Sequence, residues 1–285
     1  MKNHKLKAFC KINLSLRVSK KLSNGYHKIQ SFISFGDLYD EIYVSEINKP
    51  KDKIIFSGRF KNGISAKSNT VAKVLKFFRQ NNMLKNKIFR IKIKKNIPHG
   101  SGLGGGSSDA ASLINFFNSK MNLKLNNSKI YKLANLVGSD VLCNLVKKNL
   151  YLTGKKMKIL KLNNKFNILI VFPNIWCSTS RIYSKNRSFS SLNSVSSNVL
   201  NNKRRLIRFL QNEHNDLEKI VVTMHPIIGK IIRTISIQKG CYFSRLTGSG
   251  SACIGLFSND KTVSLAKKNI KRKFPNHWCM ISKTI

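Results

Sequence analysis

The sequence predicts a mixed α+β fold organised in two domains, residues 1–156 and 157–285. Three observations lead to this prediction. At 285 residues the chain is longer than one typical domain. Strand-like and helix-like patterns of Ile, Leu, Val and Phe recur along the whole chain. After Thr153-Gly154 a new strand and a long polar connection follow, so we place the domain boundary near residue 156.

The first domain is expected to open with antiparallel strands. Lys5–Ser19 and Gln30–Val44 are rich in β-branched and aromatic residues. Asn24-Gly25, between the two segments, is a hairpin signal. A further strand is predicted over Ile54–Ser57.

Helices are then expected to alternate with a strand. Ser68 or Asn69 can cap a helix with one clear apolar face. That face is formed by Val71, Val74, Leu75 and Phe78. Ile88–Lys95 alternates apolar with basic residues, which predicts a half-buried strand. Three more helices are predicted to begin near Ser107, Ser128 and Ser139, with Gly138 ending the second of them.

The second domain is predicted to alternate helices and strands around a long polar connection, Ser184–Arg205. Its predicted strands are Phe166–Phe172, Tyr242–Leu246, Ala252–Phe257 and Trp278–Ser282. Its predicted helices are Lys203–Gln211, Asp216–Thr223, Pro226–Gln238 and Lys261–Arg272. We find no internal repeat.

The net charge is extreme, because 53 Lys and Arg face only 11 Asp and Glu, which leaves +42. Such a charge is typical of proteins that bind nucleic acids or membrane surfaces. Here the basic residues are spread along the whole chain as short pairs, such as Lys94-Lys95, and form no single basic arm. A general drift of composition toward Lys, Asn and Ile explains that spread better, and an anionic substrate fits it equally well.

The cysteines and the N-terminus point to the cytoplasm. The six cysteines form no C-x-x-C pair, so they indicate neither a zinc site nor a disulfide framework. No apolar run approaches the length of a membrane span, and the first residues lead directly into a patterned strand without a signal-peptide core.

A glycine-rich segment between a predicted strand and a predicted helix has the composition that a polyphosphate site requires. Glycines allow positive φ and close approach, so that successive backbone N–H groups converge on phosphate oxygens. The following helix presents its positive end to the anion. A flexible glycine linker is a weaker explanation, because well-patterned elements flank the segment on both sides. The candidate ATP-binding residues are Pro98, His99, Gly100, Ser101, Gly102, Leu103, Gly104, Gly105, Gly106, Ser107 and Ser108.

Three familiar nucleotide loops do not fit this segment. Gly100, Gly102 and Gly105 match the dinucleotide pattern G-x-G-x-x-G, but no acid that could bind a ribose lies between Asp109 and Asp140. A Walker A loop would need a lysine near its end, which is missing here. The H-R-D and D-F-G motifs of protein kinases are absent as well.

The run from Pro98 to Ala111, Pro-x-Gly-x-Gly-Leu-Gly-Gly-Gly-Ser-Ser-Asp-Ala-Ala, closely resembles the ATP loop of the galactokinase, homoserine kinase, mevalonate kinase and phosphomevalonate kinase superfamily. The flanking motifs resemble the branch of that superfamily whose acceptor is 4-diphosphocytidyl-2-C-methyl-D-erythritol. They are Lys11-Ile-Asn13-Leu, Asn24-Gly-Tyr26-His27, Gly138-Ser-Asp140-Val, Asn215-Asp-Leu-Glu218 and Ser244–Ala252. The resemblance runs in order over most of the chain, from residue 7 to residue 257.

The resemblance implies a two-domain small-molecule kinase fold, with a βαβ arrangement in the N-terminal domain and an α/β sandwich in the C-terminal domain. It also implies transfer of the ATP γ-phosphoryl group, with Mg²⁺ accompanying the nucleotide, to the 2-hydroxyl of the acceptor. This reaction is a step of the non-mevalonate route to isoprenoid precursors. The expected protein is cytoplasmic, acts on a small molecule, binds neither nucleic acid nor membrane, and is a monomer or homodimer.

Residue roles follow from the same resemblance. Asp140 is expected to be the catalytic carboxylate and Lys11 its cationic partner. From the sequence alone, Asp140 is equally well explained as a helix N-cap, and Lys11 as a solvated strand residue. The substrate-binding residues implied are Asn13, Tyr26, His27, Thr179 and Tyr183. Gly248-Ser-Gly-Ser251 is expected to close over the active site, or else to be a tight turn.

Two positions depart from the family pattern. Ser23-Asn24 replaces a usual Arg-x-Asp, and Leu142 stands where Pro normally follows Asp-Val. Together with the compositional bias, these departures are consistent with an enzyme of reduced turnover, and two further alternatives rest on the superfamily and on the basic charge. The chain could phosphorylate homoserine, mevalonate or a sugar, although Gly25-Tyr26-His27 argues against that. It could also be a basic RNA-binding module.

Overall fold

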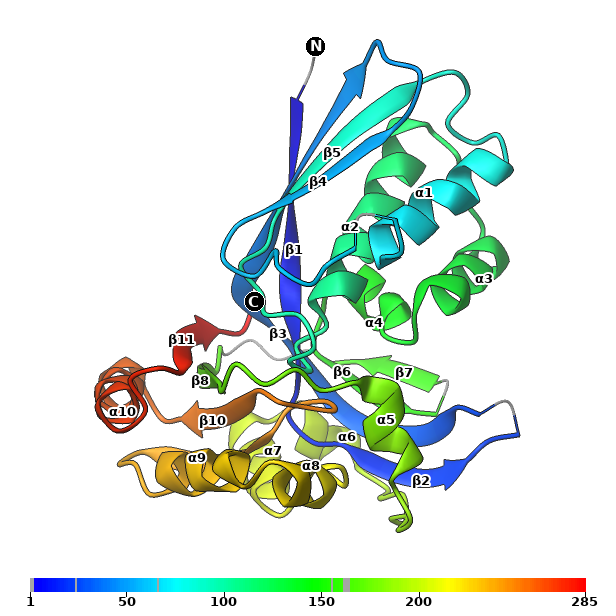
Figure 1. Ribbon diagram of the computed structural model, residues 1–285. Helices are drawn as coiled ribbons and strands as arrows, with labels where there is room; N and C mark the ends of the chain where they lie inside the picture. The colour runs from blue at the N-terminus through cyan, green and yellow to red at the C-terminus, as the bar shows by residue number, and fades with distance from the viewer. Residues whose placement is uncertain (1–2, 24, 66, 155, 161–164) are drawn as a thin grey trace. The chain divides into compact units, whose positions relative to one another are not determined.

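The computed structural model describes residues 3–23, 25–65, 67–154, 156–160 and 165–285 (Figure 1). The strands are β1 (Asn3–Asn13), β2 (Arg17–Lys21), β3 (His27–Ile47), β4 (Lys53–Ser57), β5 (Ile88–Lys94), β6 (Leu150–Thr153), β7 (Lys156–Ile159), β8 (Asn167–Phe172), β9 (Cys241–Leu246), β10 (Cys253–Phe257) and β11 (Trp278–Lys283). The helices are α1 (Thr70–Gln80), α2 (Gly105–Lys120), α3 (Asn127–Val137), α4 (Val141–Val146), α5 (Thr179–Ser184), α6 (Ser197–Leu200), α7 (Lys203–Gln211), α8 (Glu218–Met224), α9 (Pro226–Ser236) and α10 (Asp260–Lys273). Asn24, in the predicted hairpin turn, lies outside the described residues.

The chain forms two compact units, each made of several separate stretches. Unit 1 contains the described residues up to Lys11, together with Leu38–His99 and Gly104–Lys147. Unit 2 contains Ile12–Asp37, Gly100–Leu103 and Lys148–Ile285. The domain boundary near residue 156 stays a prediction.

Unit 1 packs helices α1 to α4 on one side of its strands (Figure 1). The second half of β3 pairs antiparallel with β5, and β4 pairs parallel with β5. The alternation predicted for β5 is confirmed, because Ile91 and Ile93 are buried while Lys92 and Lys94 are exposed. Continuing that alternation by one residue places Lys95 on the buried side, with only 2% of its surface exposed.

Unit 2 contains two groups of strands. The first half of β3 pairs with β2 and β6, and β6 pairs with β7. The other strands form an antiparallel sheet in the order β11-β8-β10-β9, which α9 and α10 cover. In Figure 1, α8 and α9 lie beside β10. Strands β6 and β7 and helices α5 and α6 were not predicted, because these short segments carry no apolar period that stands out from the residues around them.

The start of α1 decides between the two capping candidates of the sequence. Asn69 is the N-cap, and its side chain accepts a hydrogen bond of 2.9 Å from the backbone of Ala72. We expect Asn69→Ala to lower the free energy of unfolding by about 1 kcal/mol, because an N–H of the first turn loses its acceptor. Ser68→Ala, the matched control, should stay within about 0.5 kcal/mol of the wild type. Urea unfolding of both variants checks this, and equal effects at the two positions would contradict the capping geometry.

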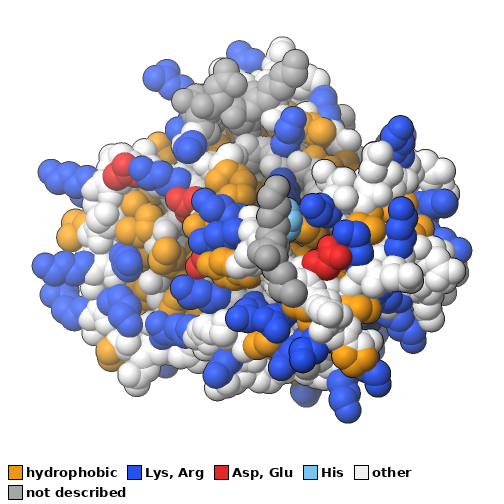
Figure 2. All heavy atoms as spheres, turned by 90° about the horizontal axis from the view of Figure 1, so that it is seen from above, with side chains coloured by type: hydrophobic (Ala, Val, Ile, Leu, Met, Phe, Trp, Pro, Cys, Tyr) orange, Lys and Arg blue, Asp and Glu red, His pale blue; other side chains and the backbone are white. Residues whose placement is uncertain are grey.

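The surface is basic over wide areas. Figure 2 shows Lys and Arg side chains scattered across the visible face, with few acidic groups between them. This spread agrees with the even distribution of basic residues along the sequence. Among the described residues, no helix is both long and apolar enough to cross a membrane.

Candidate active site

Lys11 and Asp140 meet in unit 1. Lys11 is the last residue of the β1 stretch of that unit, and Asp140 stands just before α4. The Lys11 Nζ lies 2.9 Å from Asp140 Oδ2. The ammonium side chain is 4% exposed and the carboxylate side chain 37% exposed, so the pair opens to solvent on the Asp140 side.

Asp140 does not cap α4 with its side chain. Its backbone is in the right-handed helical region, with φ −85° and ψ −7°, and its side chain makes no capping hydrogen bond. An N-cap residue normally has extended backbone and a side-chain oxygen on an amide of the first turn. Asp140 therefore occupies the N-cap position of α4 without capping it through its side chain, and its carboxylate pairs with Lys11 instead.

The glycine-rich segment is divided between the two units, because Gly100–Leu103 belong to unit 2 and Gly104–Ser108 to unit 1. In unit 1, Gly104 has φ +66°, and a Cβ there would lie 3.1 Å from Lys11 Cβ. Helix α2 starts at Gly105 and not at Ser107, so the last residues of the predicted loop form its first turn. Their backbone N–H groups are at the positive end of a helix of 16 residues.

The serines of the segment differ in exposure. Ser101 and Ser108 are both 1% exposed, whereas Ser107 is only partly buried. A Cβ on Gly138 would lie 3.7 Å from the Ser107 hydroxyl oxygen. Ser107 therefore lies beside the turn that leads into Asp140.

In unit 2 the first glycines of the segment pack against backbone. Gly102 has φ +80°, and a Cβ there would overlap the carbonyl of Thr247 and lie 3.0 Å from Gly250 N. Ser101 O also accepts a hydrogen bond of 2.9 Å from Ala252 N. The two glycine motifs of the sequence thus touch each other through main-chain atoms, which only glycine permits at Gly102.

Trp176 covers the start of the segment within unit 2. A Cβ on Gly100 would overlap the indole of Trp176, and the backbone of Cys177 donates a hydrogen bond of 3.0 Å to Gly100 O. Even so, Trp176 is 61% exposed. The indole therefore leaves one side open beside the loop.

A buried charge cluster joins the two ends of the glycine-rich segment in unit 1. The Lys95 ammonium contacts Asp40 and also lies 2.6 Å from Asp109 Oδ2. Asp40 Oδ1 accepts hydrogen bonds from the backbone of Asn96 at 2.6 Å and of Ile97 at 2.8 Å. Lys95 precedes the segment and Asp109 follows it, so this cluster ties β3, the end of β5 and the first turns of α2 together.

Burial and ion pairing together set the pKa values of the cluster. Burial raises the pKa of Asp109 to about 7, with Lys95 opposing and Asp40 reinforcing that rise. Burial on its own would lower the pKa of Lys95, but the two carboxylates outweigh it, so the pKa of Lys95 is raised. The ammonium is thus charged at neutral pH.

Aromatic side chains gather around His27 in unit 2. The ring centroids of His27 and Tyr183 are 5.0 Å apart, and Phe189 stacks at 6.5 Å with an interplanar angle of 23°. Tyr26, the residue before His27 in the sequence, is 54% exposed. Burial, together with the charge of Lys21, lowers the pKa of His27, so its imidazole is neutral at pH 7.

The remaining predicted substrate residues meet the second glycine motif. Thr179 Oγ1 lies 2.9 Å from Ser249 Oγ, and the backbone N–H of Asn13 donates to Thr247 Oγ1 at 2.9 Å. Thr179 and Tyr183 are four residues apart on α5, so they share one face of that helix. Helix α5 thereby connects the glycine motif with the aromatic group around His27. Asn13 itself is 3% exposed, and its amide donates to a neighbouring Ser hydroxyl at 2.7 Å.

Three residues of the candidate site were not identified from the sequence. Phe189 lies in the polar connection, where no periodic pattern marks an aromatic residue. Trp176 was not singled out. Lys95 could have been found, since the alternation of β5 carries one residue further and predicts an inward lysine that must meet an acid.

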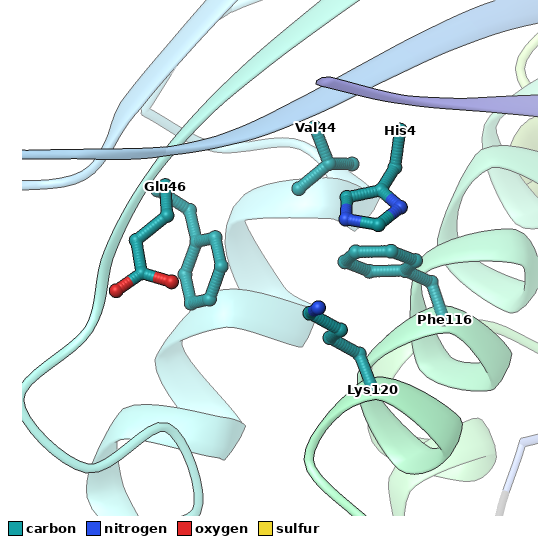
Figure 3. A pocket seen from close by; sticks show the side chains of 6 residues that line it. His4, Val44, Glu46, Phe116 and Lys120 are labelled. Carbon is teal, nitrogen blue, oxygen red and sulfur yellow. The ribbon is translucent and has the colours of Figure 1, made fainter. Parts of the chain in front are cut away.

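A small pocket elsewhere in unit 1 is lined by other residues (Figure 3). His4 lies against Phe116, with 5.2 Å between ring centroids. Glu46, at its side, pairs with Lys87 at 2.8 Å. None of the predicted site residues lines this pocket. Among the described residues, no group of three or more His, Cys, Asp or Glu is placed to hold a metal ion.

This chain resembles kinases of one family. Residues 69–146 match the N-terminal domain model of the GHMP kinases, and residues 196–276 match the C-terminal model. A 4-diphosphocytidyl-2-C-methyl-D-erythritol kinase of Pelagibacter ubique is 42% identical over the full length of both chains. One from Caldanaerobacter subterraneus is 33% identical over 99% of this chain and 96% of the relative.

Solved structures share the fold. A crystal structure of a 4-(cytidine 5'-diphospho)-2C-methyl-D-erythritol kinase has a TM-score of 0.79 at 23% identity, covering 99% of this chain and 100% of the other. A homoserine kinase from Cytophaga hutchinsonii has a TM-score of 0.68 at 15% identity, covering 98% of this chain and 95% of the other. The predicted α+β two-domain kinase fold is confirmed.

Proposed function

Because the chain belongs to the GHMP kinases, and within them to the family of 4-diphosphocytidyl-2-C-methyl-D-erythritol kinases, we propose that it phosphorylates the 2-hydroxyl of 4-diphosphocytidyl-2-C-methyl-D-erythritol. ATP is the phosphoryl donor of this small-molecule kinase. The product serves the non-mevalonate route to isoprenoid precursors.

One observation carries the assignment of residues to the chemistry. Lys11 lies against Gly104 of the glycine-rich segment and forms an ion pair of 2.9 Å with Asp140. A cation next to the phosphate loop and a carboxylate held by that cation are the two groups that phosphoryl transfer to an alcohol needs. Asp140 accepts or orients the proton of the attacking hydroxyl, and Lys11 stabilises the charge that develops on the transferred group.

The nucleotide contacts are proposed for Pro98 to Ser108. Backbone N–H groups of the glycines and of the first turn of α2 bind the phosphate oxygens. We propose that Mg²⁺ accompanies the ATP phosphates. Magnesium usually keeps its waters and needs only one or two protein oxygens, so the partly exposed Ser107 hydroxyl beside Gly138 fits as a ligand without a protein metal cage.

The acceptor contacts are proposed for unit 2. Tyr26 and His27 hold the cytosine, because an exposed ring can stack on a base and a neutral imidazole can hydrogen-bond its edge. Asn13, Thr179 and Tyr183 line the same acceptor site. Because Phe189 stacks on His27, we propose that it belongs to the same acceptor site. The departures at Ser23 and Leu142 remove none of the groups named here.

Partners and compartment are proposed on the same basis. We propose a cytoplasmic enzyme that acts as a monomer or a homodimer and whose basic charge serves no nucleic-acid partner. Its two-domain division is proposed near residue 156, between the segments that match the two family models.

A substrate panel tests the function. Purified protein is incubated with ATP, Mg²⁺ and one acceptor at a time, and ADP formation is followed in a coupled assay. Turnover with 4-diphosphocytidyl-2-C-methyl-D-erythritol, and not with mevalonate, homoserine or galactose, is expected. ADP formation with one of the other three alone would reassign the substrate.

Tyr26→Ala tests the cytosine contact. Loss of one stacked ring should raise the KM for the acceptor about tenfold, since base stacking contributes about 1 to 3 kcal/mol. The KM for ATP should not change. Tyr131→Ala, which removes a ring that is 44% exposed on α3, is the matched control. Steady-state kinetics with each substrate varied in turn decides the matter, and an unchanged acceptor KM would refute the contact.

A further inference from the structure

The Asn215-Asp216-Leu-Glu218 motif has no part in the function proposed above, yet it makes a dense set of contacts in unit 2. The Asn215 amide donates to Leu246 O at 2.9 Å and to Gly248 O at 2.8 Å, and so holds the second glycine motif. Glu218 accepts a hydrogen bond of 2.7 Å from the backbone of Leu246. The Asp216 carboxylate instead accepts hydrogen bonds from Val18 and Ser190.

Asp216 holds two segments of chain at once. Its Oδ2 accepts a hydrogen bond of 2.6 Å from the backbone of Val18 in β2. Its Oδ1 accepts one of 2.8 Å from the hydroxyl of Ser190 and lies 2.7 Å from His214 Nε2. The backbone of Ser190 in turn donates to Val18 O at 2.9 Å. Ser190 is thereby fixed to β2 both directly and through Asp216.

Ser190 belongs to residues 185–196, the connection between α5 and α6, which we call the strap. The strap is also fixed at Asn193, whose backbone N–H and carbonyl form a pair of 2.9 Å hydrogen bonds with the side chain of Gln30 in β3. The Asn193 amide donates to Glu213 Oε1 at 2.8 Å, and Glu213 is held in a bidentate pair by Arg17 at 2.8 and 3.0 Å. A polar connection is therefore bound at defined points to β2 and to β3, the strand that begins at His27.

The residue next to Ser190 is Phe189, whose ring stacks on His27 while remaining 48% exposed. The strap has no helix or strand of its own between α5 and α6, so the hydrogen bonds of Ser190 and Asn193 place this ring. If these hydrogen bonds were absent, the ring would lose conformational entropy on binding a ligand, and the affinity for that ligand would be lower.

We propose that Ser190 and Asp216 are positioning residues for the acceptor: they hold Phe189 beside His27 and so set the affinity for the cytidine diphosphate part of the substrate. This inference rests on the proposed function, because it takes the aromatic group around His27 as the base-binding site. The rate of phosphoryl transfer is not set by these two residues.

Ser190→Ala is the sharpest test, because it removes the strap's bond to Asp216 and leaves the contact between Asp216 and Val18 intact. The KM for the acceptor and the Kd for cytidine diphosphate, measured by calorimetry, should each rise about tenfold, the size expected for one charge-assisted hydrogen bond. The KM for ATP and kcat should stay within about twofold. Ser190→Thr keeps the hydroxyl and should restore wild-type affinity.

Asp216→Asn extends the test. If both residues act through the same bond, the double variant with Ser190→Ala should be no weaker than the more affected single variant. Asp260→Asn removes a carboxylate that is 66% exposed and pairs with Lys283, and serves as the control with wild-type affinity. Equal loss of affinity for ATP and for cytidine diphosphate, or an unchanged Kd in Ser190→Ala, would overturn the inference.

A readout without substrate separates this inference from the proposed function. Arg187 is exposed within the strap, and trypsin cleavage there can be followed by mass spectrometry. Cleavage should be several-fold faster in Ser190→Ala than in the wild type, and unchanged in Asp260→Asn. A wild-type chain that does not bind cytidine diphosphate would refute the function, whereas equal cleavage at Arg187 in Ser190→Ala and in the wild type would refute the strap.

Discussion

Asp140→Asn is expected to lower kcat about 10³-fold, within the range observed when a general base is lost. The amide has the size of the carboxylate but cannot accept the proton of the attacking hydroxyl. The KM for ATP should change by no more than about twofold, since Asp140 is not among the proposed nucleotide contacts. Stopped assays at saturating substrate, with the melting temperature measured alongside, check this.

The surroundings of Asp140 allow its effect on catalysis to be separated from an effect on folding. The Asp140 side chain is more than a third exposed and makes no capping bond, so the variant should fold as the wild type does. Lys11→Met removes the partner at 2.9 Å and should lower kcat by a similar factor, and the two changes together should cost little more than either alone. A loss smaller than tenfold in Asp140→Asn would mean that another group accepts the proton.

Lys95→Met is expected to lower the free energy of unfolding by about 3 to 5 kcal/mol at neutral pH, because it leaves two buried carboxylates without their counter-charge. Asp109 already has an Oδ1 that is buried with no hydrogen-bond partner among the described residues. Lys94→Met is the matched control, since the neighbouring lysine side chain is 54% exposed and pairs only loosely with Glu41 at 3.3 Å. Its loss should stay below about 1 kcal/mol.

Lower pH should partly rescue Lys95→Met. In the wild type, burial raises the folded-state pKa of Asp109 to about 7, above its ordinary value of 3.8, and Lys95 opposes that rise. Without Lys95 the pKa lies higher still, so the folded variant holds that proton more tightly than the unfolded chain and more tightly than the folded wild type does. Folding is therefore favoured as the pH falls from about 7 toward 4. Urea unfolding at about pH 7.5 and pH 5.5 should show a smaller deficit at the lower pH. A deficit independent of pH would mean that the lost stability comes from packing and not from charge.

Strongly patterned elements could be predicted from the sequence, and those without a repeat could not. Val71, Val74, Leu75 and Phe78 lie at helical spacing and are buried in α1. The short strands β6 and β7 have no such length of pattern, and their place depends on pairing with β3. These two strands form because of hydrogen bonds to segments that are distant along the chain, and a short stretch of sequence does not reveal such bonds.

The candidate site shows a similar division. Lys11 and Asp140 could be named because they stand in specific motifs, although their separation of 129 positions along the chain gives no hint of a contact of 2.9 Å. Composition would never have distinguished Lys11 among 53 basic residues. Phe189 had no motif at all. Its position depends on bonds to Val18, Asp216 and Gln30, each of them distant in sequence from the strap.

The contact between Gly100 and Trp176 gives the chain an optical property. The sequence contains two tryptophans, of which Trp278 is 9% exposed and Trp176 is 61% exposed. Indole emission shifts to longer wavelength in water, so the two residues emit from different surroundings and can be told apart. The emission of Trp176 depends on what lies next to Gly100. The chain thus carries an unlabelled fluorescent reporter at the start of its glycine-rich segment, and Trp278→Phe would leave Trp176 as the single source of indole emission.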